Sequence, residues 1–236
     1  MDIYILWILV IFSIILTCYA QVKVSSNYNR YSKVMAGSGI TASVLARQIL
    51  DIAGLKDIKV VRVSGTMTDY YNHKKKIIAL SDGVYDSSSV SALGIVAHEV
   101  GHALQYQTGY FPIKLRIFTI FVSNLVSKLL WPMLIIGVLL DIFIVMAVPV
   151  GLYLIYGILA LFVISTLVSF VTLPVEKNAS NRALQILSDM NALDEHELMG
   201  AKAVLDSAGL TYVAGFVGSL VNLLRIIFIL TRNSRR

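Results

Sequence analysis

The chain contains 236 residues, of which 57% are apolar and only 14% are charged. Soluble proteins carry about 25% charged residues, so this composition excludes an ordinary soluble protein and requires much of the apolar surface to face lipid. The net charge of +6 does not indicate nucleic-acid binding, because the basic residues lie beside the apolar segments, as topology signals do. The single cysteine, Cys18, excludes an intrachain disulfide.

The first apolar segment predicts a transmembrane anchor over residues 1–20. Residues 3–20 carry no charge and are close to the length of about 20 residues that a helix needs to cross a bilayer. A cleaved signal peptide is the alternative, because Cys18 and Ala20 are small enough for a cleavage site. The segment before the apolar run contains Asp2 and no Lys or Arg, which is atypical of a signal peptide, so a retained anchor is favoured.

Residues 21–116 are polar enough to form the first part of a small folded domain. The apolar stripe of residues 39–53 predicts a helix. Residues 58–64 and 75–81 are rich in β-branched side chains and are separated by the polar, turn-prone sequence TDYYNHK, which predicts a small sheet. The serines at 87–89 then offer N-caps for a helix that carries the sequence VSALGIVAHEVGHALQ.

Residues 117–173 are nearly all apolar, too long for one membrane span and long enough for two, which predicts a transmembrane helical hairpin. Asp141 and the Pro149–Gly151 stretch mark the expected region of its turn. The second part of the small domain, residues 174–212, is expected to start with a new helix, because Pro174 suits the first turn of a helix.

Apolar periodicity predicts helices over residues 174–189 and 195–208, followed by a last apolar helix over 211–230. The final predicted segment, residues 213–236, consists of this apolar C-terminal helix and a basic tail. The last helix either spans the membrane, lies along its surface or packs on the other helices, and spanning is favoured. Two polar residues interrupt this helix, Asn222 and Arg225. Together, the predicted elements indicate an α-rich α+β membrane protein.

The strongest chemical signal is the sequence HEVGH, which runs from His98 to His102. On a helix, positions i and i+4 share one face, so both imidazoles can reach one zinc ion. Glu99 can act as the general base that takes a proton from a zinc-activated water and passes it to the leaving amine. A pair of surface histidines is the alternative, but the apolar flanks predict a buried helix, where unpaired polar groups are costly. The arrangement is that of HExxH zinc metallopeptidases.

A catalytic zinc ion normally takes a third protein ligand. Asp194 and Glu197 have the spacing of a capping box, which explains the sequence DEHEL without a metal. Glu176 falls in the first turn of a helix that leaves the membrane, where its carboxylate is either a ligand or a favourable charge at a helix N-terminus. Besides the aspartates, the remaining candidates are His73, His196 and Glu195.

Four segments resemble the YugP-like family of bacterial neutral zinc metallopeptidases, in the same order and over nearly the whole chain. They are TDYYNHKKKIIALSDGVY, ALGIVAHEVGHALQYQTGY, LPVEKNASNRAL and LDEHELMGAKAVLDSAGLTYVA. The resemblance implies transmembrane helices and a small gluzincin-like domain, split between residues 21–116 and 174–212, with a short β-sheet and the HExxH helix. LPVEKNASNRAL also looks like the third-ligand helix of gluzincin-type membrane proteases, which implies that Glu176 is the third ligand.

The same resemblance draws attention to residues around the ligands. Ser180 stands where the gluzincin-type relatives often place an Asp that supports a ligand histidine; a hydroxyl orients imidazole but adds less basicity. Asn178 and Asp189 are alternatives for that role. By analogy, residues 75–81 form an edge strand that aligns an extended peptide, with an ordinary hairpin as the alternative. Three side chains could stabilise the oxyanion or bind substrate, Tyr70, Tyr71 and His73.

The predicted spans place residues 21–116 and 174–212 on one side of the membrane, so the two halves of the metal site can meet. Basic residues border that side and favour the cytoplasm. A fourth span would place Arg232, Arg235 and Arg236 outside, against the same rule. Either the last helix does not cross, or the larger basic set dominates.

These features predict a multi-pass cell-membrane endopeptidase that uses one Zn²⁺ ion and acts on protein or peptide substrates. A zinc-binding scaffold or chaperone without catalytic activity is the alternative, and it would have four protein ligands. A transporter is disfavoured, because the sequence has no visible internal repeat.

Overall fold

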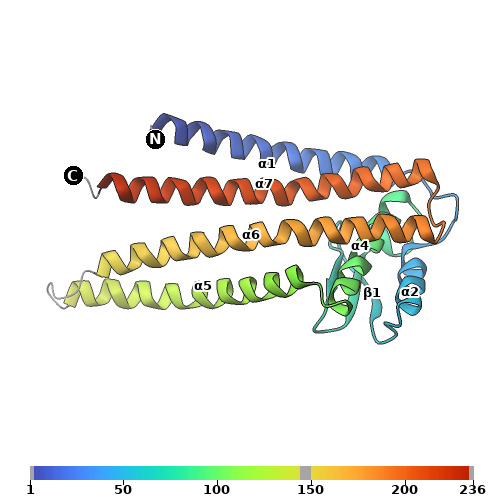
Figure 1. The fold of residues 1–236 in the computed structure, drawn as a ribbon, viewed down its shortest axis with the longest axis horizontal. Coiled ribbons are helices and arrows are strands. Elements are labelled where there is room, and N and C mark those ends of the chain that lie inside the picture. Colours follow the sequence, from blue (N-terminus) through green and yellow to red (C-terminus); the bar gives the residue numbers. More distant parts are fainter. Residues whose placement is uncertain (1–2, 144–149, 234–236) are drawn as a thin grey trace. The chain divides into compact units, whose positions relative to one another are not determined.

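The structure is a computed structural model, and it describes residues 3–143 and 150–233. The chain divides into two compact units. The helical unit comprises Met1–Thr17, Lys114–Thr172 and Tyr212–Arg236, and the mixed unit comprises Cys18–Ile113 and Leu173–Thr211. In chain order, the elements are α1 (Ile3–Tyr31), α2 (Ala42–Ile52), β1 (Lys59–Val63), β2 (Tyr70–Asn72), β3 (Ile77–Ser81), α3 (Asp82–Tyr85), α4 (Val90–Gln107), α5 (Phe111–Phe143), α6 (Val150–Asp189) and α7 (Glu195–Asn233) (Figure 1).

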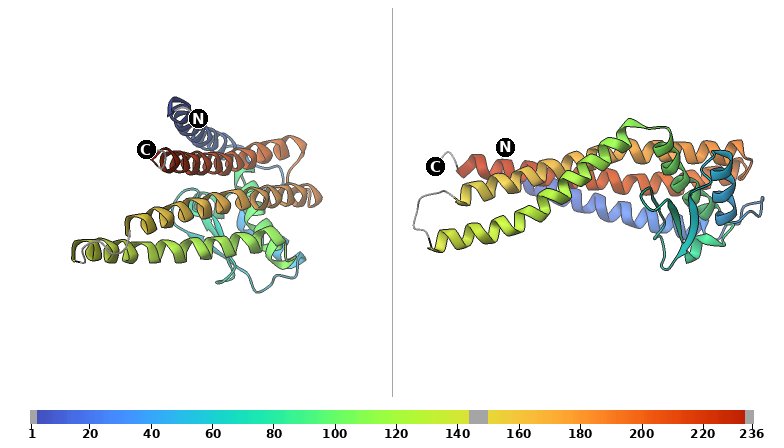
Figure 2. Two further views of the ribbon diagram at one scale, coloured as in Figure 1. Left: turned by 60° about the vertical axis from the view of Figure 1, so that its left-hand side comes forward. Right: turned by 90° about the horizontal axis from the view of Figure 1, so that it is seen from below.

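The helical unit consists of long apolar helices. Within it, α5 runs beside the first part of α6, and the start of α1 runs beside the end of α7 (Figure 2). The Arg225 guanidinium of α7 lies 5.6 Å from the centre of the Trp7 ring of α1. Among the described residues, α1, α6 and α7 each contain a segment long and apolar enough to cross a membrane. A span through α5, which has 33 residues, stays a prediction.

Two predicted helix boundaries are wrong. Pro174 was expected to start a new helix, but it lies inside α6, which runs without a break to Asp189. A proline removes one N–H donor while keeping a φ angle compatible with a helix, so a long helix that is packed on both sides of it can continue. The helices predicted over 195–208 and 211–230 are likewise one helix, α7. The predicted turn of the hairpin falls mainly on residues 144–149, which lie outside the described residues.

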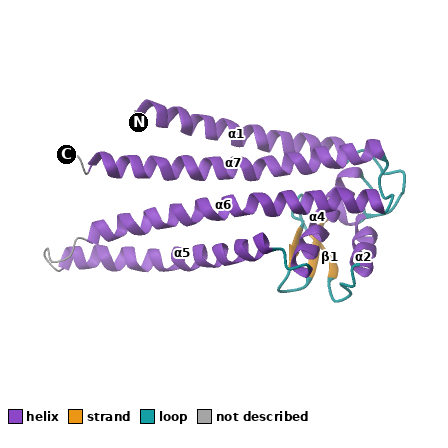
Figure 3. Cartoon of the chain, in the orientation of Figure 1, coloured by secondary structure: helices purple, strands orange, loops and turns teal. Residues whose placement is uncertain are grey.

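The strands are all in the mixed unit in the part of the chain that the structure describes (Figure 3). The predicted strands are confirmed as β1 and β3, but they pair in parallel, so they do not form a hairpin. The sequence TDYYNHK was expected to be only a turn, yet it contains β2, which pairs antiparallel with β3. The sheet order is β1-β3-β2. Residues 75–81 therefore hold the central strand, and the prediction that they form an edge strand is wrong.

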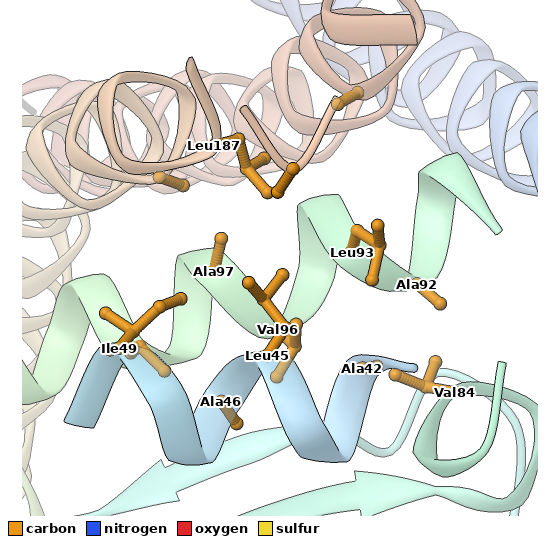
Figure 4. Packing of buried hydrophobic residues seen from close by; sticks show 14 of the residues in the cluster. Ala42, Leu45, Ala46, Ile49, Val84, Ala92, Leu93, Val96, Ala97 and Leu187 are labelled. Carbon is orange, nitrogen blue, oxygen red and sulfur yellow. The ribbon is translucent and has the colours of Figure 1, made fainter. Parts of the chain in front are cut away.

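Helix α4 runs through the core of the mixed unit. Its apolar residues Leu93, Val96 and Ala97 are buried, and they pack against Leu45 of α2 and Leu187 of α6 (Figure 4). Burying an aliphatic side chain stabilises the fold by about 1.5–3 kcal/mol, so this packing fixes the position of the helix that carries HEVGH.

The predicted caps of two helices are present. The Ser89 side chain accepts a hydrogen bond from the Ala92 N–H, 3.3 Å away, at the start of α4. Asp194 and Glu197 exchange backbone-to-carboxylate hydrogen bonds of 2.8 Å at the start of α7, which is the reciprocal pattern of a capping box. Helix capping thus explains Asp194 and Glu197 of the sequence DEHEL without a metal.

Candidate metal centre

Two imidazoles of α4 and one carboxylate of α6 meet inside the mixed unit. His98 and His102 are one helical turn apart, and their ring centres are 4.7 Å from each other. The Oε2 atom of Glu176 lies 3.2 Å from His98 Nε2 and 3.5 Å from His102 Nε2. The Glu176 side chain is 4% exposed, so this carboxylate is buried against the two imidazoles.

The geometry of these three side chains fits a zinc ion. Zinc–nitrogen bonds of about 2.0–2.1 Å with tetrahedral angles place neighbouring ligand atoms about 3.3 Å apart. The two contacts of Glu176, 3.2 and 3.5 Å, bracket this distance. One ligand atom from each of the three residues lies within 4.8 Å of the others. Two imidazoles and one carboxylate form a donor set that zinc accepts, and this group can therefore hold one metal ion.

The charge around His102 also suits a cation. Burial alone would lower the pKa of His102, but the hydrogen bond with Glu176 and the negative charges of Glu99 and Glu176 outweigh burial and raise the pKa. Two carboxylates therefore act on the His102 imidazole, which must be neutral to bind a metal. A divalent cation would compensate this excess negative charge.

Each histidine also has a partner on its Nδ1 atom. The Ser180 hydroxyl of α6 lies 3.1 Å from His98 Nδ1, as expected for a residue that supports a ligand histidine. Gln105 Oε1 lies 3.0 Å from His102 Nδ1. Sequence reasoning missed Gln105, although a glutamine three residues after the second histidine, on an apolar helix, was an available signal. Asn178, the alternative to Ser180, contacts Gln105 at 3.0 Å.

Two of the three residues predicted for substrate binding, Tyr71 and His73, contact Tyr106 near the end of α4. The His73 ring stacks on Tyr106 of α4 with 4.5 Å between ring centres, and the Tyr71 ring meets Tyr106 edge-on at 5.6 Å. Tyr70 is exposed on β2. Burial and the charge of Lys74 lower the pKa of His73, which favours its neutral form. His196, the other histidine among the ligand candidates, is exposed near the start of α7.

Long apolar helices and a buried His–His–Glu group together describe a membrane protein with a candidate zinc site. The chain belongs to the family described as "Putative neutral zinc metallopeptidase", which matches residues 6–231. It is 41% identical over 215 residues to a protein of Bacillus subtilis (strain 168) named "Putative membrane protease YugP", with 91% of each chain covered. No solved structure matches the chain significantly. The predicted family is thus confirmed.

Proposed function

We propose that this protein is a membrane-bound, zinc-dependent endopeptidase of the HExxH type with a gluzincin-like catalytic domain. In this proposal, His98, His102 and Glu176 hold the zinc ion, and Glu99 is the catalytic base. The observation that carries the proposal is the convergence of Nε2 atoms of both histidines on one carboxylate oxygen, at 3.2 and 3.5 Å. The name of the Bacillus relative also supports a membrane protease.

The proposed mechanism assigns Glu99 a different role from the three ligands. A bound zinc ion would supply a Lewis acid that polarises a peptide carbonyl and makes a water molecule more acidic. Glu99 would take the proton of the attacking water and pass it to the nitrogen of the leaving amine. Glu99 adjoins His98 on α4, and its charge raises the pKa of His102, which supports placing its carboxylate beside the proposed site.

The size of the donor set favours catalysis over a structural role. The metal-binding group found among the described residues has three members. Catalytic zinc sites keep three protein ligands and an open position, whereas structural sites are closed by four protein ligands. A zinc-binding scaffold or chaperone remains the competing function, and the absence of hydrolysis by zinc-loaded protein would favour it.

We also propose that two stretches of the chain form one catalytic domain on the cytoplasmic side of the membrane. Residues 21–116 and 174–212 form the catalytic domain, while residues 1–20, 117–173 and 213–236 hold it at the cell membrane. The catalytic site faces the cytoplasm. Lys23, Lys33, Lys114 and Lys177, which border the apolar segments, support this orientation.

The first prediction separates catalysis from metal binding. Glu99→Gln removes the base and leaves the three ligands, so we expect peptide hydrolysis to fall by about 10²–10⁴-fold while the purified protein still holds one zinc ion. Glu176→Ala should lose both zinc and hydrolysis, because it removes a ligand. Metal content and cleavage of an unstructured protein substrate are measured for the parent and both variants.

One control and two contrary outcomes complete this test. Glu195→Gln changes an exposed glutamate at the start of α7 and should leave both measurements unchanged. Cleavage by Glu99→Gln at the parental rate would refute the mechanism. Zinc binding by Glu176→Ala with parental affinity would refute its role as third ligand.

A further inference from the structure

Gln105 is fully buried in α4, three residues after His102. Its Oε1 atom lies 3.0 Å from His102 Nδ1. Its Nε2 atom lies 2.7 Å from the carbonyl oxygen of Val175 and 3.0 Å from Asn178 Oδ1, both in α6. One amide therefore connects a histidine of the metal centre to the helix that carries Glu176.

The partners of Gln105 determine which way its amide faces. The backbone carbonyl of Val175 can only accept a hydrogen bond, so the atom that faces it must be the amide nitrogen. Arg182 Nε lies 2.9 Å from Asn178 Oδ1, and a guanidinium can only donate, so Asn178 also presents its oxygen to this network. The nitrogen of Gln105 thus faces α6, and its oxygen faces His102.

This orientation sets the tautomer of His102. An amide oxygen can only accept, so the contact between Gln105 Oε1 and His102 needs a proton on Nδ1, and an imidazole that keeps this contact while it binds a metal is the Nδ1–H tautomer. The lone pair of the ring is then on Nε2, the atom that lies 3.5 Å from Glu176 Oε2. A metal-binding imidazole needs its lone pair on the atom that faces the ion.

We propose that Gln105 is a positioning residue of the metal centre. It holds His102 as the Nδ1–H tautomer, with Nε2 ready for the metal, and it links that histidine to the helix of the third ligand. The inference rests on the proposed zinc site. Ser180 differs from Gln105, because a hydroxyl can donate or accept and therefore does not impose a tautomer on His98.

Zinc affinity of two Gln105 variants tests the proposal. Gln105→Met keeps an unbranched side chain but removes the acceptor, and we expect zinc binding to weaken by about 10–100-fold. Gln105→Glu keeps an acceptor for His102 Nδ1–H, and it should bind zinc at least about tenfold more tightly than Gln105→Met. Affinities are measured on the full chain by competition with a chromophoric chelator, and the visible spectrum of bound Co²⁺ reports the geometry of the ligands.

The matched control is Gln107→Met, which changes an exposed glutamine of the same helix that donates to the Ala53 carbonyl. It should bind zinc as the parent does. Parental affinity in Gln105→Met would overturn the proposal. Equal loss of affinity in Gln105→Met and Gln105→Glu would also overturn it, because that result would show that the contacts of Gln105 with α6, which both variants lose, matter and its acceptor contact with His102 does not.

A measurement on the unmutated chain covers the case in which a variant does not fold. In zinc-loaded protein labelled with ¹⁵N-histidine, the nitrogen shifts of His102 should show a proton on Nδ1 and none on Nε2. A proton on Nε2 would overturn the proposal. These measurements do not need peptide hydrolysis. They therefore test the role of Gln105 separately from the proposed protease activity: either proposal can fail while the other holds.

Discussion

Ser180 and Gln105 support the two histidines with different chemistry. Ser180 presents a hydroxyl to His98 Nδ1 at 3.1 Å, and Gln105 presents a carbonyl oxygen to His102 Nδ1 at 3.0 Å. A hydroxyl can rotate and exchange its donor and acceptor roles, whereas an amide oxygen can only accept. The His98 side of the centre is therefore held less strictly than the His102 side.

Substitutions of Ser180 can test how much the partner of His98 Nδ1 contributes to zinc affinity. Ser180→Ala removes the partner of His98 Nδ1 and is expected to weaken zinc binding by about tenfold, the lower end of the usual effect of such partners. Ser180→Asp supplies a carboxylate, which fixes the Nδ1–H tautomer and raises the basicity of the ligand. It should bind zinc at least as tightly as the parent. Both affinities are measured by chelator competition.

The control for Ser180 is Ser188→Ala, which changes an exposed serine of the same helix. Equal zinc affinities of Ser180→Ala and the parent would show that the contact with His98 has no effect on metal binding.

At the level of single residues, much of the centre was predictable. His98 and His102 follow from helical spacing, because positions i and i+4 share one face of any helix. Glu176 lies 74 residues after His102 in the numbering, and only the resemblance to known proteases selected it from the other acidic residues. Gln105 was missed because its function depends on Val175 and Asn178 of α6, and helix spacing within α4 gives no information about those contacts.

Helices α4 and α6 come unusually close at the middle of the HEVGH sequence. A Cβ atom added at Gly101 would lie 2.8 Å from the carbonyl oxygen of Ala179. Ala179 lies between Glu176 and Ser180, so this contact sets how near the carboxylate and the hydroxyl are to the histidines. Glycine at 101 is needed for the closeness of the two helices, since its backbone has an ordinary helical conformation.

We therefore expect Gly101→Ala to push α6 away from α4. Overpacking of this kind typically destabilises a protein by about 1–3 kcal/mol, and here it should also weaken zinc binding because Glu176 moves with α6. The measurements are the apparent melting temperature of the purified protein and its zinc affinity by chelator competition.

Gly94→Ala is the matched control on the same helix. Its added methyl group would lie 3.3 Å from the Ala201 side chain of α7, a milder contact than that with a backbone oxygen. Alanine also favours the helix by about 0.5–1 kcal/mol relative to glycine, which offsets part of the crowding. If Gly101→Ala and Gly94→Ala behaved alike, close contact at Gly101 would not be the cause of the effect.

At the level of elements, the sequence predicts local structure better than it predicts connections. The caps at Ser89 and Asp194 involve residues three positions apart, and the structure confirms them. The strand β2 was missed because its side chains are polar and it has only three residues, so its pairing with β3 decides its structure. The continuity of α6 through Pro174 was also missed, because a proline signals a break unless packing on both sides outweighs one lost hydrogen bond.

At the level of the whole molecule, the mixed unit is assembled from two stretches of chain that are separated by apolar helices. Cys18–Ile113 supplies the two histidines, and Leu173–Thr211 supplies Glu176. Both stretches must therefore lie on the same side of the membrane. This requires an even number of crossings between them, as in the predicted hairpin, of which α6 contains a candidate span among the described residues.

The side on which the mixed unit lies, and the crossing of α7, can be tested together with single cysteines. In a Cys18→Ser background, Ser188→Cys labels the mixed unit and Thr231→Cys labels the end of α7, and both positions are exposed. The basic residues favour the cytoplasm for the mixed unit, so a membrane-impermeant maleimide should label Ser188→Cys only in permeabilised cells. It should label Thr231→Cys in intact cells, because α7 contains an apolar segment long enough to cross the bilayer. Labelling of both cysteines from one side would show that α7 does not cross. Labelling of Ser188→Cys in intact cells would place the mixed unit outside, against the positive charges that border it.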